Sequence, residues 1–159
     1  MAFCTVYSCC TNNYDDLDST LFASKPLEEF GIERVLFTNC EEPYEKRGWK
    51  VRPLQWKHKL SPRRTARWHK VNSHLLFPES DYTVWMDANL TIKPIHVLKT
   101  LLLPHLIDNP VATFKHPGRS CVYGEAEACK RLKKDNPELI NKQMKAYRVA
   151  GYPPYNGLV

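Results

Sequence analysis

Short apolar runs alternate with stretches of helical periodicity along the chain. Residues 3–8 and 34–38 are rich in aromatic and β-branched side chains and end in polar turns, which is typical of strands. Residues 49–56 predict a third strand, which its proline confines to an edge of the sheet. Residues 82–86 are nearly all apolar and predict a strand buried on both faces, and residues 111–114 predict a short further strand.

Segments with helical spacing separate these strands. Ser61 and Pro62 predict the start of a helix that reaches about residue 76, because serine caps a helix N-terminus and proline suits the first turn. Residues 95–107, 123–133 and 136–150 predict further helices, and Asn136-Pro137 opens the last of them. Strands that alternate with helices predict an α/β fold with a mostly parallel sheet flanked by helices, and 159 residues suit a single domain.

Composition excludes several classes of protein. With 43% hydrophobic and 25% charged residues, the chain lies in the globular range, so a disordered chain is excluded. No apolar run approaches the roughly 20 residues that cross a bilayer, so we expect no membrane span. The six cysteines form no C-x-x-C pair and follow no secretion signal, which predicts reduced thiols and a cytoplasmic location. The glycine-rich fingerprints of dinucleotide-binding and P-loop proteins do not occur in the sequence.

The net charge of +6 is concentrated in one segment. Ten of the 23 basic residues lie between Lys46 and Lys70, a window without Asp or Glu, and elsewhere the 17 acidic residues outnumber the bases. A positive field this local attracts phosphate groups. A nucleotide, a nucleic acid and an acidic polymer are therefore all candidate partners.

The helix that begins at Pro62 carries part of this charge on one side. At about 100° per residue, a single narrow stripe holds Arg63, Arg67, Lys70 and His74. The neighbouring stripe is expected to face the sheet and holds Trp68, Val71 and Leu75. Basic side chains at the edge of the packed face could reach phosphate oxygens, and an ordinary solvated helix face is the alternative.

Asp87 and Asn89 follow the strand predicted at residues 82–86. Ligands of open α/β sheets bind outside the carboxyl ends of the strands, so Asp87 is well placed to meet one. Oxygen atoms of a carboxylate and an amide two residues apart could bind Mg²⁺ or Mn²⁺, and such a metal bridges a diphosphate. A turn stabilised by the Asp side chain is the alternative.

A third group of polar residues follows the strand predicted at residues 111–114. In the segment His116-Pro-Gly-Arg119, Arg119 could hold an anion, and the nearby Glu125 could orient a sugar hydroxyl or act as a base. A turn with a surface helix behind it would give the same pattern.

Together, in their order and spacing, these segments resemble a known family. It is the glycosyltransferase-like family formerly known as domain of unknown function 616, which occurs in plant mucilage- and pectin-related proteins and in bacterial and viral relatives. The resemblance covers nearly the whole chain. It rests mainly on Ala66-Arg67-Trp-His-Lys70, Trp85-Met-Asp87-Ala-Asn89 and His116-Pro-Gly-Arg119-Ser-Cys-Val-Tyr123-Gly-Glu125-Ala. Shorter matches are Tyr14-Asp15, Phe37-Thr-Asn39, Gly48-Trp49, Tyr147 and Gly151-Tyr-Pro.

The resemblance implies a GT-A-like, Rossmann-like glycosyltransferase domain over residues 1–159. Such a domain transfers a sugar from a nucleoside diphosphate, here expected to be UDP, with Mn²⁺ or Mg²⁺ as cofactor. Asp87 and Asn89 would correspond to the metal and diphosphate site of the family. Arg67 and Lys70 would help to neutralise the diphosphate.

The resemblance also implies the remaining site residues. Tyr14, Asp15 and Asn39 would complete the donor site, with Asn39 near the nucleotide base. The sugar or the acceptor would bind at His116, Arg119 and Glu125. The catalytic residues would be Asp87 and Glu125.

Two positions depart from the family pattern, and the chain is short for a GT-A fold. Asn39 stands where relatives often carry Asp, and Gly124 stands where they often carry a second acid. Relatives continue past Gly157-Leu-Val with another strand. We therefore expect a natural truncation, a gene fragment, or a nucleotide-sugar-binding part that needs a second component.

Two other functions stay open. A catalytically silent relative would bind the donor or the acceptor without turnover. A nucleic-acid-binding module would stack bases on Trp49, Trp56 and Trp68, which are interleaved with the basic residues. We rank sugar transfer first and expect no nucleic acid partner, and the acceptor is a glycan or another molecule.

Overall fold

The computed structural model describes residues 3–12, 31–40, 48–88, 90 and 103–155. The chain forms two compact units, Met1–Leu103 and Pro104–Val159, and each is described by itself. The single domain expected from the length stays a prediction. Among the described residues, no helix has both the length and the apolar character needed to cross a membrane.

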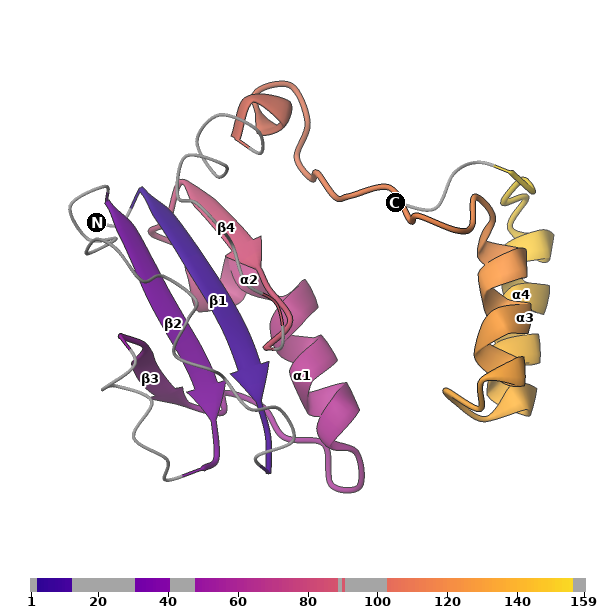
Figure 1. Cartoon of the computed structure of the whole chain (residues 1–159), viewed down its shortest axis with the longest axis horizontal. Coiled ribbons are helices and arrows are strands. Elements are labelled where there is room, and N and C mark those ends of the chain that lie inside the picture. The colour runs from indigo at the N-terminus through magenta and orange to yellow at the C-terminus, as the bar shows by residue number, and fades with distance from the viewer. Residues whose placement is uncertain (1–2, 13–30, 41–47, 89, 91–102, 156–159) are drawn as a thin grey trace. The chain divides into compact units, whose positions relative to one another are not determined.

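A parallel sheet forms the centre of the first unit. Its strands are β1 (Cys4–Cys10), β2 (Ile32–Thr38), β3 (Lys50–Pro53) and β4 (Tyr82–Trp85), in the order β3-β2-β1-β4. Every pairing is parallel, which confirms the expected α/β fold (Figure 1). The proline-containing β3 lies at one end of the described sheet, as its sequence predicts.

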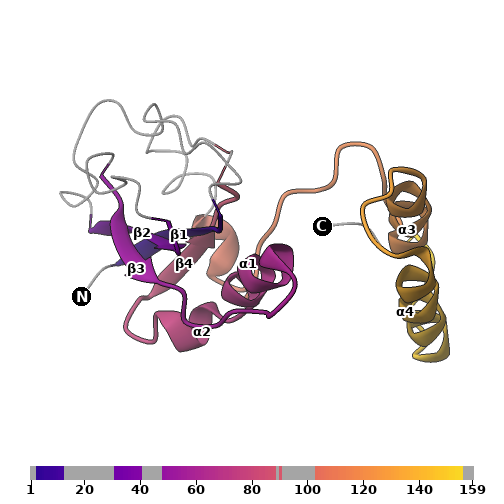
Figure 2. The same cartoon turned by 90° about the horizontal axis from the view of Figure 1, so that it is seen from below.

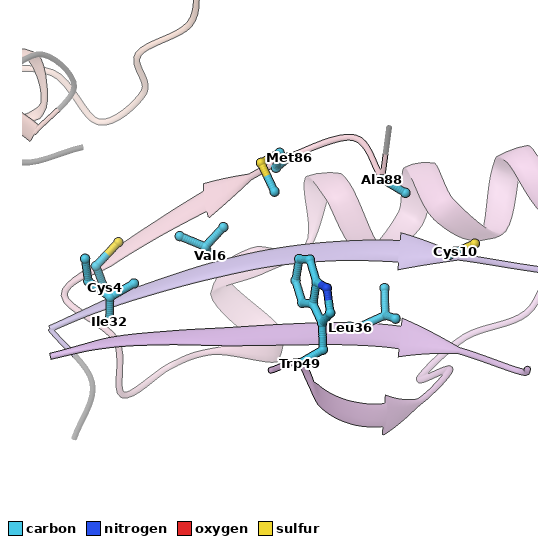
Figure 3. Close-up of a cluster of buried hydrophobic side chains, with 8 residues drawn as sticks. All are labelled: Cys4, Val6, Cys10, Ile32, Leu36, Trp49, Met86 and Ala88. Atoms are coloured by element: carbon cyan, nitrogen blue, oxygen red, sulfur yellow. The ribbon is translucent and has the colours of Figure 1, made fainter. Parts of the chain in front are cut away.

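β1 is one of the two inner strands of the described sheet, and its seven residues are all buried. Successive side chains of a strand point to opposite faces, so β1 contributes to two apolar clusters. The first cluster is shown in Figure 3 and consists of Cys4, Val6, Cys10, Ile32, Leu36, Trp49, Met86 and Ala88. The second lies on the opposite face and consists of Tyr7, Cys9, Val35, Phe37 and Phe77.

β4 is less enclosed than its sequence predicts. We expect a strand buried on both faces, but all four residues of β4 are half-buried. Within the described part of the chain, β4 has a strand neighbour, β1, on one side only. An apolar sequence therefore occupies one end of this sheet rather than its middle.

Helix α1 (Pro62–Val71) packs against β1 and, with α2 (Ser73–Leu76), lies along one face of the sheet (Figure 2). It begins as predicted, because the Ser61 side chain accepts a backbone N–H of the first turn at 3.2 Å. It ends earlier than predicted, where the Asn72 side chain donates to the Trp68 carbonyl at 2.8 Å. The short α2 then continues to the predicted end.

The side of α1 that packs on the sheet differs from the predicted one. We expect Trp68, Val71 and Leu75 to face the sheet, but Val71 is 69% exposed and Leu75 is 62% exposed. The buried residues of α1 are Thr65 and His69. These polar side chains occupy the inner position because their hydrogen bonds are completed there.

Thr65 and His69 join α1 to the segment that precedes it. The Gln55 N–H donates to Nε2 of His69 at 3.1 Å, and Nδ1 of His69 donates to the Thr65 carbonyl at 2.9 Å. The His58 N–H donates to Oγ1 of Thr65 at 2.9 Å. These bonds select the neutral Nδ1–H tautomer of His69, and burial lowers the pKa of His69 below its ordinary value of 6.5.

A short 3₁₀ turn, η5 (Leu103–Leu106), spans the boundary between the units, and the second unit contains two longer helices. Helix α3 (Val122–Arg131) packs against α4 (Pro137–Val149), as Figure 1 shows. Both match predicted helices. Asn136 caps α4 as expected, since its side chain accepts the Glu138 N–H at 2.8 Å.

Two other predictions concern the segment before α3. The strand predicted at residues 111–114 is wrong, because these residues form no strand and pair with none among the described residues. Their side chains Val111 and Phe114 are exposed. Of the helix predicted at residues 95–107, residues 95–102 lie outside the described part of the chain, and the next four form η5.

Replacing His69 with Gln should lower the free energy of unfolding of the first unit by about 1–3 kcal/mol, because buried hydrogen-bonding groups lose their partner. The wild type should also become less stable as the pH falls below 6.5, because unfolding lets His69 take up a proton that the folded state resists. Above the unfolded pKa this contribution is fully present. Urea unfolding followed by circular dichroism between about pH 8 and pH 5 measures both effects.

The same change at His74, an exposed residue of α2, is the control and should have little effect. A His69→Gln variant with the pH dependence of the wild type would show that His69 is not buried in its neutral form.

Candidate functional site

The order of the strands reverses direction at β1. From β1 the chain adds β2 and β3 on one side, and then crosses to add β4 on the other side. In open parallel sheets, ligands bind outside the carboxyl ends of the strands at such a reversal. Asp87 follows β4 closely and therefore lies at this edge of the sheet.

Of the side chains that the structure describes, those of Trp85 and Lys70 contact the Asp87 carboxylate. Nε1 of Trp85 donates to Oδ1 of Asp87 at 2.6 Å, and Nζ of Lys70 lies 3.7 Å from the same oxygen. Nζ of Lys70 also lies 5.6 Å from the centroid of the Trp85 ring, which is a cation–π distance. The side chains of Lys70 and Asp87 are 50% and 58% exposed, so their ion pair adds little stability and is open to a ligand.

Tyr7 of β1 positions both partners of Asp87. Its hydroxyl donates to the Lys70 carbonyl at 2.8 Å, and its ring packs edge-on against Trp85 with the centroids 5.2 Å apart. Burial raises the pKa of Tyr7 to about 12, so the hydroxyl keeps the proton that it donates. The place of Lys70 beside Asp87 therefore follows from the packing of α1 on β1.

The structure brings one of the two predicted diphosphate ligands of α1 to Asp87. Lys70 contacts the carboxylate. Arg67 is exposed about one turn earlier on the helix, and no ion pair joins it to Asp87 within the described residues. Arg67 can contribute to the positive field of this region without contacting the carboxylate.

A pair of amide side chains lies at the ends of β1 and β2. Nδ2 of Asn39 donates to Oδ1 of Asn12 at 2.8 Å, and Oδ1 of Asn39 accepts the Asn12 N–H at 3.0 Å. Asn12 has a φ of 58°, in the left-handed region that asparagine tolerates better than most residues. The predicted donor-site residue Asn39 thus lies at the carboxyl edge of the sheet.

Three predicted site residues lie outside the described part of the chain, namely Tyr14, Asp15 and Asn89. Their expected roles in donor and metal binding stay predictions.

Asp87 has the donor chemistry for a divalent metal but does not form a metal site by itself. Among the residues that the structure describes, no three or more His, Cys, Asp and Glu side chains come together in a group that could hold a metal ion. In nucleotide sites, Mg²⁺ is often held by one or two carboxylates together with phosphate oxygens and water. A half-exposed carboxylate beside a lysine fits this mode of binding.

In the second unit, the structure brings His116, Arg119 and Glu125 together. Nε of Arg119 donates to Oε2 of Glu125. Nδ1 of His116 accepts the N–H groups of Gly118 at 3.1 Å and of Arg119 at 3.0 Å, which holds the ring in the turn. Nε2 of His116 lies 3.9 Å from Oε2 of Glu125. Three residues of one predicted segment therefore form one cluster at the start of α3.

The charge of Glu125 is fixed by its neighbours. Desolvation raises the pKa of Glu125, but hydrogen bonds from Arg119 and Cys129 lower it by more, so that the net shift is downward. Sγ of Cys129 donates to Oε1 of Glu125 at 3.4 Å. A carboxylate with a lowered pKa is a weak base, so this geometry favours binding and orientation of a hydroxyl over proton abstraction. The catalytic role expected for Glu125 stays a prediction.

A groove of about 740 Å³ in the second unit is lined by residues of α3, of α4 and of the segment after α4. The hydroxyl of Tyr123 donates to the Tyr152 carbonyl at 2.8 Å, and the Arg148 guanidinium lies 4.8 Å from the Tyr123 ring centroid. These contacts connect the two helices to the segment that follows them.

Cys121 contributes a thiol to this groove and occupies the N-cap position of α3. Backbone hydrogen bonds from Tyr155 and Gly124 lower the pKa of Cys121 below its ordinary value of 9.0. Burial instead raises the pKa of Cys4 to about 11 and that of Cys9 to about 12. Cys121 is therefore more reactive than these two thiols.

The sequence analysis did not predict the roles of three residues at these sites, namely Asn12, Trp85 and Cys121. Asn12 follows the first strand as Asn39 follows the second, and this parallel was an available signal. Trp85 precedes Asp87 by two residues and so shares its side of an extended chain. Cys121 lies two residues before the helix predicted at residues 123–133, near a helix start, where a side chain meets free backbone N–H groups.

Comparison with known proteins identifies relatives of this chain. The family model for the TOD1/MUCI70, glycosyltransferase-like domain matches residues 40–158, which include Asp87 and Glu125. Alkaline ceramidase TOD1 of Arabidopsis thaliana is 27% identical to the chain over 137 residues, which are 83% of this chain and 29% of the relative. The chain thus spans less than a third of the length of this relative. No solved structure matches the chain at a significant level.

Replacing Arg119 with Met should raise the pKa of Glu125 toward its ordinary value of 4.5, because a charged hydrogen-bond donor to the carboxylate is removed. A ¹³C NMR titration of the glutamate carboxyl carbons measures this. Arg131→Met removes the same charge at an exposed position of α3 and should leave Glu125 unchanged. An unmoved Glu125 pKa in Arg119→Met would contradict the ion pair.

Iodoacetamide should alkylate Cys121 in the folded protein about tenfold or more faster than Cys4 or Cys9, because the thiolate is the reactive form and the latter thiols are buried. Mass spectrometry of peptides after timed labelling at neutral pH measures the three rates. In denaturant the three rates should converge, and equal rates in the folded protein would refute the difference in pKa.

Proposed function

Because the chain belongs to the TOD1/MUCI70 glycosyltransferase-like domain family, we propose that it transfers a sugar from a nucleoside diphosphate donor, with UDP as the nucleotide, to a glycan or another acceptor. The Lys70–Asp87 pair at the strand reversal carries this proposal. A diphosphate bound with a metal ion needs a cation and an oxygen ligand at one place, and the pair offers both.

Negative charge develops on the diphosphate when its bond to the sugar breaks, and stabilising this charge lowers the barrier. Among the described residues, Lys70 is the cation that contacts Asp87. Its ammonium group would stabilise part of the negative charge on the diphosphate. Arg67 would add to the field from about one turn earlier on α1. The packing of α1 on β1 holds both residues in place before the donor arrives, so little reorganisation is needed.

Asp87 would hold Mn²⁺ or Mg²⁺ together with phosphate oxygens, with Asn89 as a second ligand. When bound, the metal supplies Lewis-acid stabilisation of the diphosphate. The Trp85 N–H bond to Oδ1 orients the carboxylate for this task.

The nucleotide end of the donor would bind near the carboxyl ends of β1 and β2. Asn39 supplies an amide with both a donor and an acceptor, and Asn12 fixes its orientation. Tyr14 and Asp15 are proposed to complete this part of the donor site.

The cluster of His116, Arg119 and Glu125 would bind hydroxyl groups of the sugar or of the acceptor. Arg119 supplies N–H donors and Glu125 supplies acceptor oxygens, which are the two kinds of partner that a sugar hydroxyl needs. His116 supports the turn that carries Arg119. Asp87 and Glu125 are our candidates for the catalytic residues.

Specific observations support two alternative functions. The relative named alkaline ceramidase makes ceramide cleavage a second candidate activity. A catalytically silent binding protein would keep the Lys70–Asp87 pair for the donor without turnover. Release of UDP from UDP-sugars, set against release of fatty acid from ceramide, distinguishes these three functions.

Replacing Asp87 with Asn should weaken binding of UDP in the presence of Mn²⁺ about tenfold or more, because the carboxylate ligand is lost. Isothermal titration calorimetry with and without Mn²⁺ measures this. In the wild type, removing Mn²⁺ should cost a similar factor, whereas in Asp87→Asn the affinity should depend little on the metal.

Asp81→Asn removes the same charge from an exposed residue just before β4 and is the matched control. Equal UDP affinity in the wild type and in Asp87→Asn, with Mn²⁺ present, would refute the metal and diphosphate site.

A further inference from the structure

Apart from Arg67, the outward side of α1 plays no part in the site described above. We define the outer face of α1 as Arg64, Arg67, Trp68 and Val71 of the helix, together with Leu60 just before it and Leu75 of α2. Leu60, Val71 and Leu75 are 90%, 69% and 62% exposed. Single exposed aliphatic residues are common, but three between residues 60 and 75 give α1 and the segments beside it an unusual amount of exposed apolar surface.

The packing of α1 fixes this face outward. Thr65 and His69 occupy the opposite side of the helix, where their hydrogen bonds to the preceding segment are buried. Rolling the helix to bury Val71 would break these bonds and would bury Arg64. The outer face is therefore exposed because of how α1 is held on the sheet.

An aromatic pair extends this surface. The rings of Trp56 and Trp68 are stacked, with centroids 5.9 Å apart and planes inclined by 22°. Trp56 is 38% exposed. An indole is an apolar ring with one polar N–H group, and such rings are enriched where lipid meets water.

Positive charge surrounds the apolar residues. The sequence from Lys46 to Pro78 contains no Asp or Glu. Lys57, Lys59, Arg64 and Arg67 are all exposed in this stretch. Long basic side chains can lay their aliphatic stems along an apolar surface while their charged ends reach polar groups beyond it.

We propose that the outer face of α1 binds the surface of a membrane that contains anionic lipids. Such a surface accepts both parts of this face, since the aliphatic and indole side chains enter the boundary of the acyl chains and the basic ends reach the anionic headgroups. A nucleic acid would bind the basic side chains but leave Leu60, Val71 and Leu75 exposed to water. An apolar protein surface would cover the aliphatic side chains but leave the basic side chains without anionic partners. The proposal does not depend on sugar transfer.

The test is binding of the full chain to vesicles of phosphatidylcholine with or without one third phosphatidylserine, measured by flotation. The wild type should bind the vesicles with phosphatidylserine, and added salt should weaken this binding because it screens the headgroup charge. Lys57→Gln with Arg64→Gln should weaken it about 25-fold, at roughly fivefold for each basic residue. Val71→Ser with Leu75→Ser should weaken it about tenfold or more by removing apolar area.

Matched control variants change the second unit. Lys142→Gln with Lys145→Gln removes the same charge from exposed positions of α4, and Leu132→Ser with Val149→Ser removes exposed apolar side chains. All four substituted residues of the outer face and its surroundings are exposed, so circular dichroism should show folded variants.

Loss of vesicle binding in both α1 variants, with the controls unchanged, supports the proposal. The proposal is overturned if either α1 variant binds the vesicles as strongly as the wild type does. It is also overturned if the wild type binds equally to vesicles with and without phosphatidylserine. A single-stranded oligonucleotide that binds more tightly than the vesicles, with an affinity indifferent to Val71→Ser and Leu75→Ser, also overturns it and identifies a nucleic-acid surface instead.

Discussion

The packing of α1 on β1 through buried polar side chains is the interaction on which the rest of the first unit depends. His69 lies against Phe37 of β2, with ring centroids 4.7 Å apart, and Tyr7 of β1 donates its hydroxyl to the Lys70 carbonyl. A helix held by apolar contacts alone can shift along or around its axis at modest cost. The hydrogen bond from Tyr7 ties the helix to the sheet, and the bonds of Thr65 and His69, one turn apart, tie it to the segment before it. Together these bonds set both the rotation of the helix and its height on the sheet. Lys70 therefore lies beside Asp87, and the outer face of α1 stays exposed to solvent.

This arrangement divides α1 into three sides with different tasks. One side is buried and joins the helix to the sheet and to the segment before it. A second side carries Lys70 to the strand reversal, where a charged ligand can bind. A third carries arginines among aliphatic residues. The concentrated positive charge of the sequence is thus shared between two surfaces, and a single anionic partner need not account for all of it.

The sequence predicts most of the helices and strands, but not which side of a helix packs on the sheet. β1, β2, β3 and β4 were predicted because parallel strands are apolar runs, and α1 and α4 because Ser61-Pro62 and Asn136-Pro137 are strong start signals. The rotation of α1 was missed because hydrophobicity places Val71 inward, whereas the satisfied hydrogen bonds of His69 decide the outcome. At the sites, Asp87 and Lys70 lie together, and so do Arg119 and Glu125, while the roles expected for them stay predictions. The Asn12–Asn39 pair was missed although both residues follow neighbouring strands, because the contact between residues 27 positions apart depends on the geometry of the folded chain.

The hydrogen bond between Trp85 and Asp87 has a consequence for how this protein can be observed. Indole emission responds to the partner of its N–H group and to nearby charge, and Trp85 has both a carboxylate and an ammonium group beside it. Any ligand that draws Asp87 or Lys70 away alters the electric field at this one ring. The proposed donor site therefore contains an intrinsic fluorophore, and its occupancy can be followed by light without attaching a label.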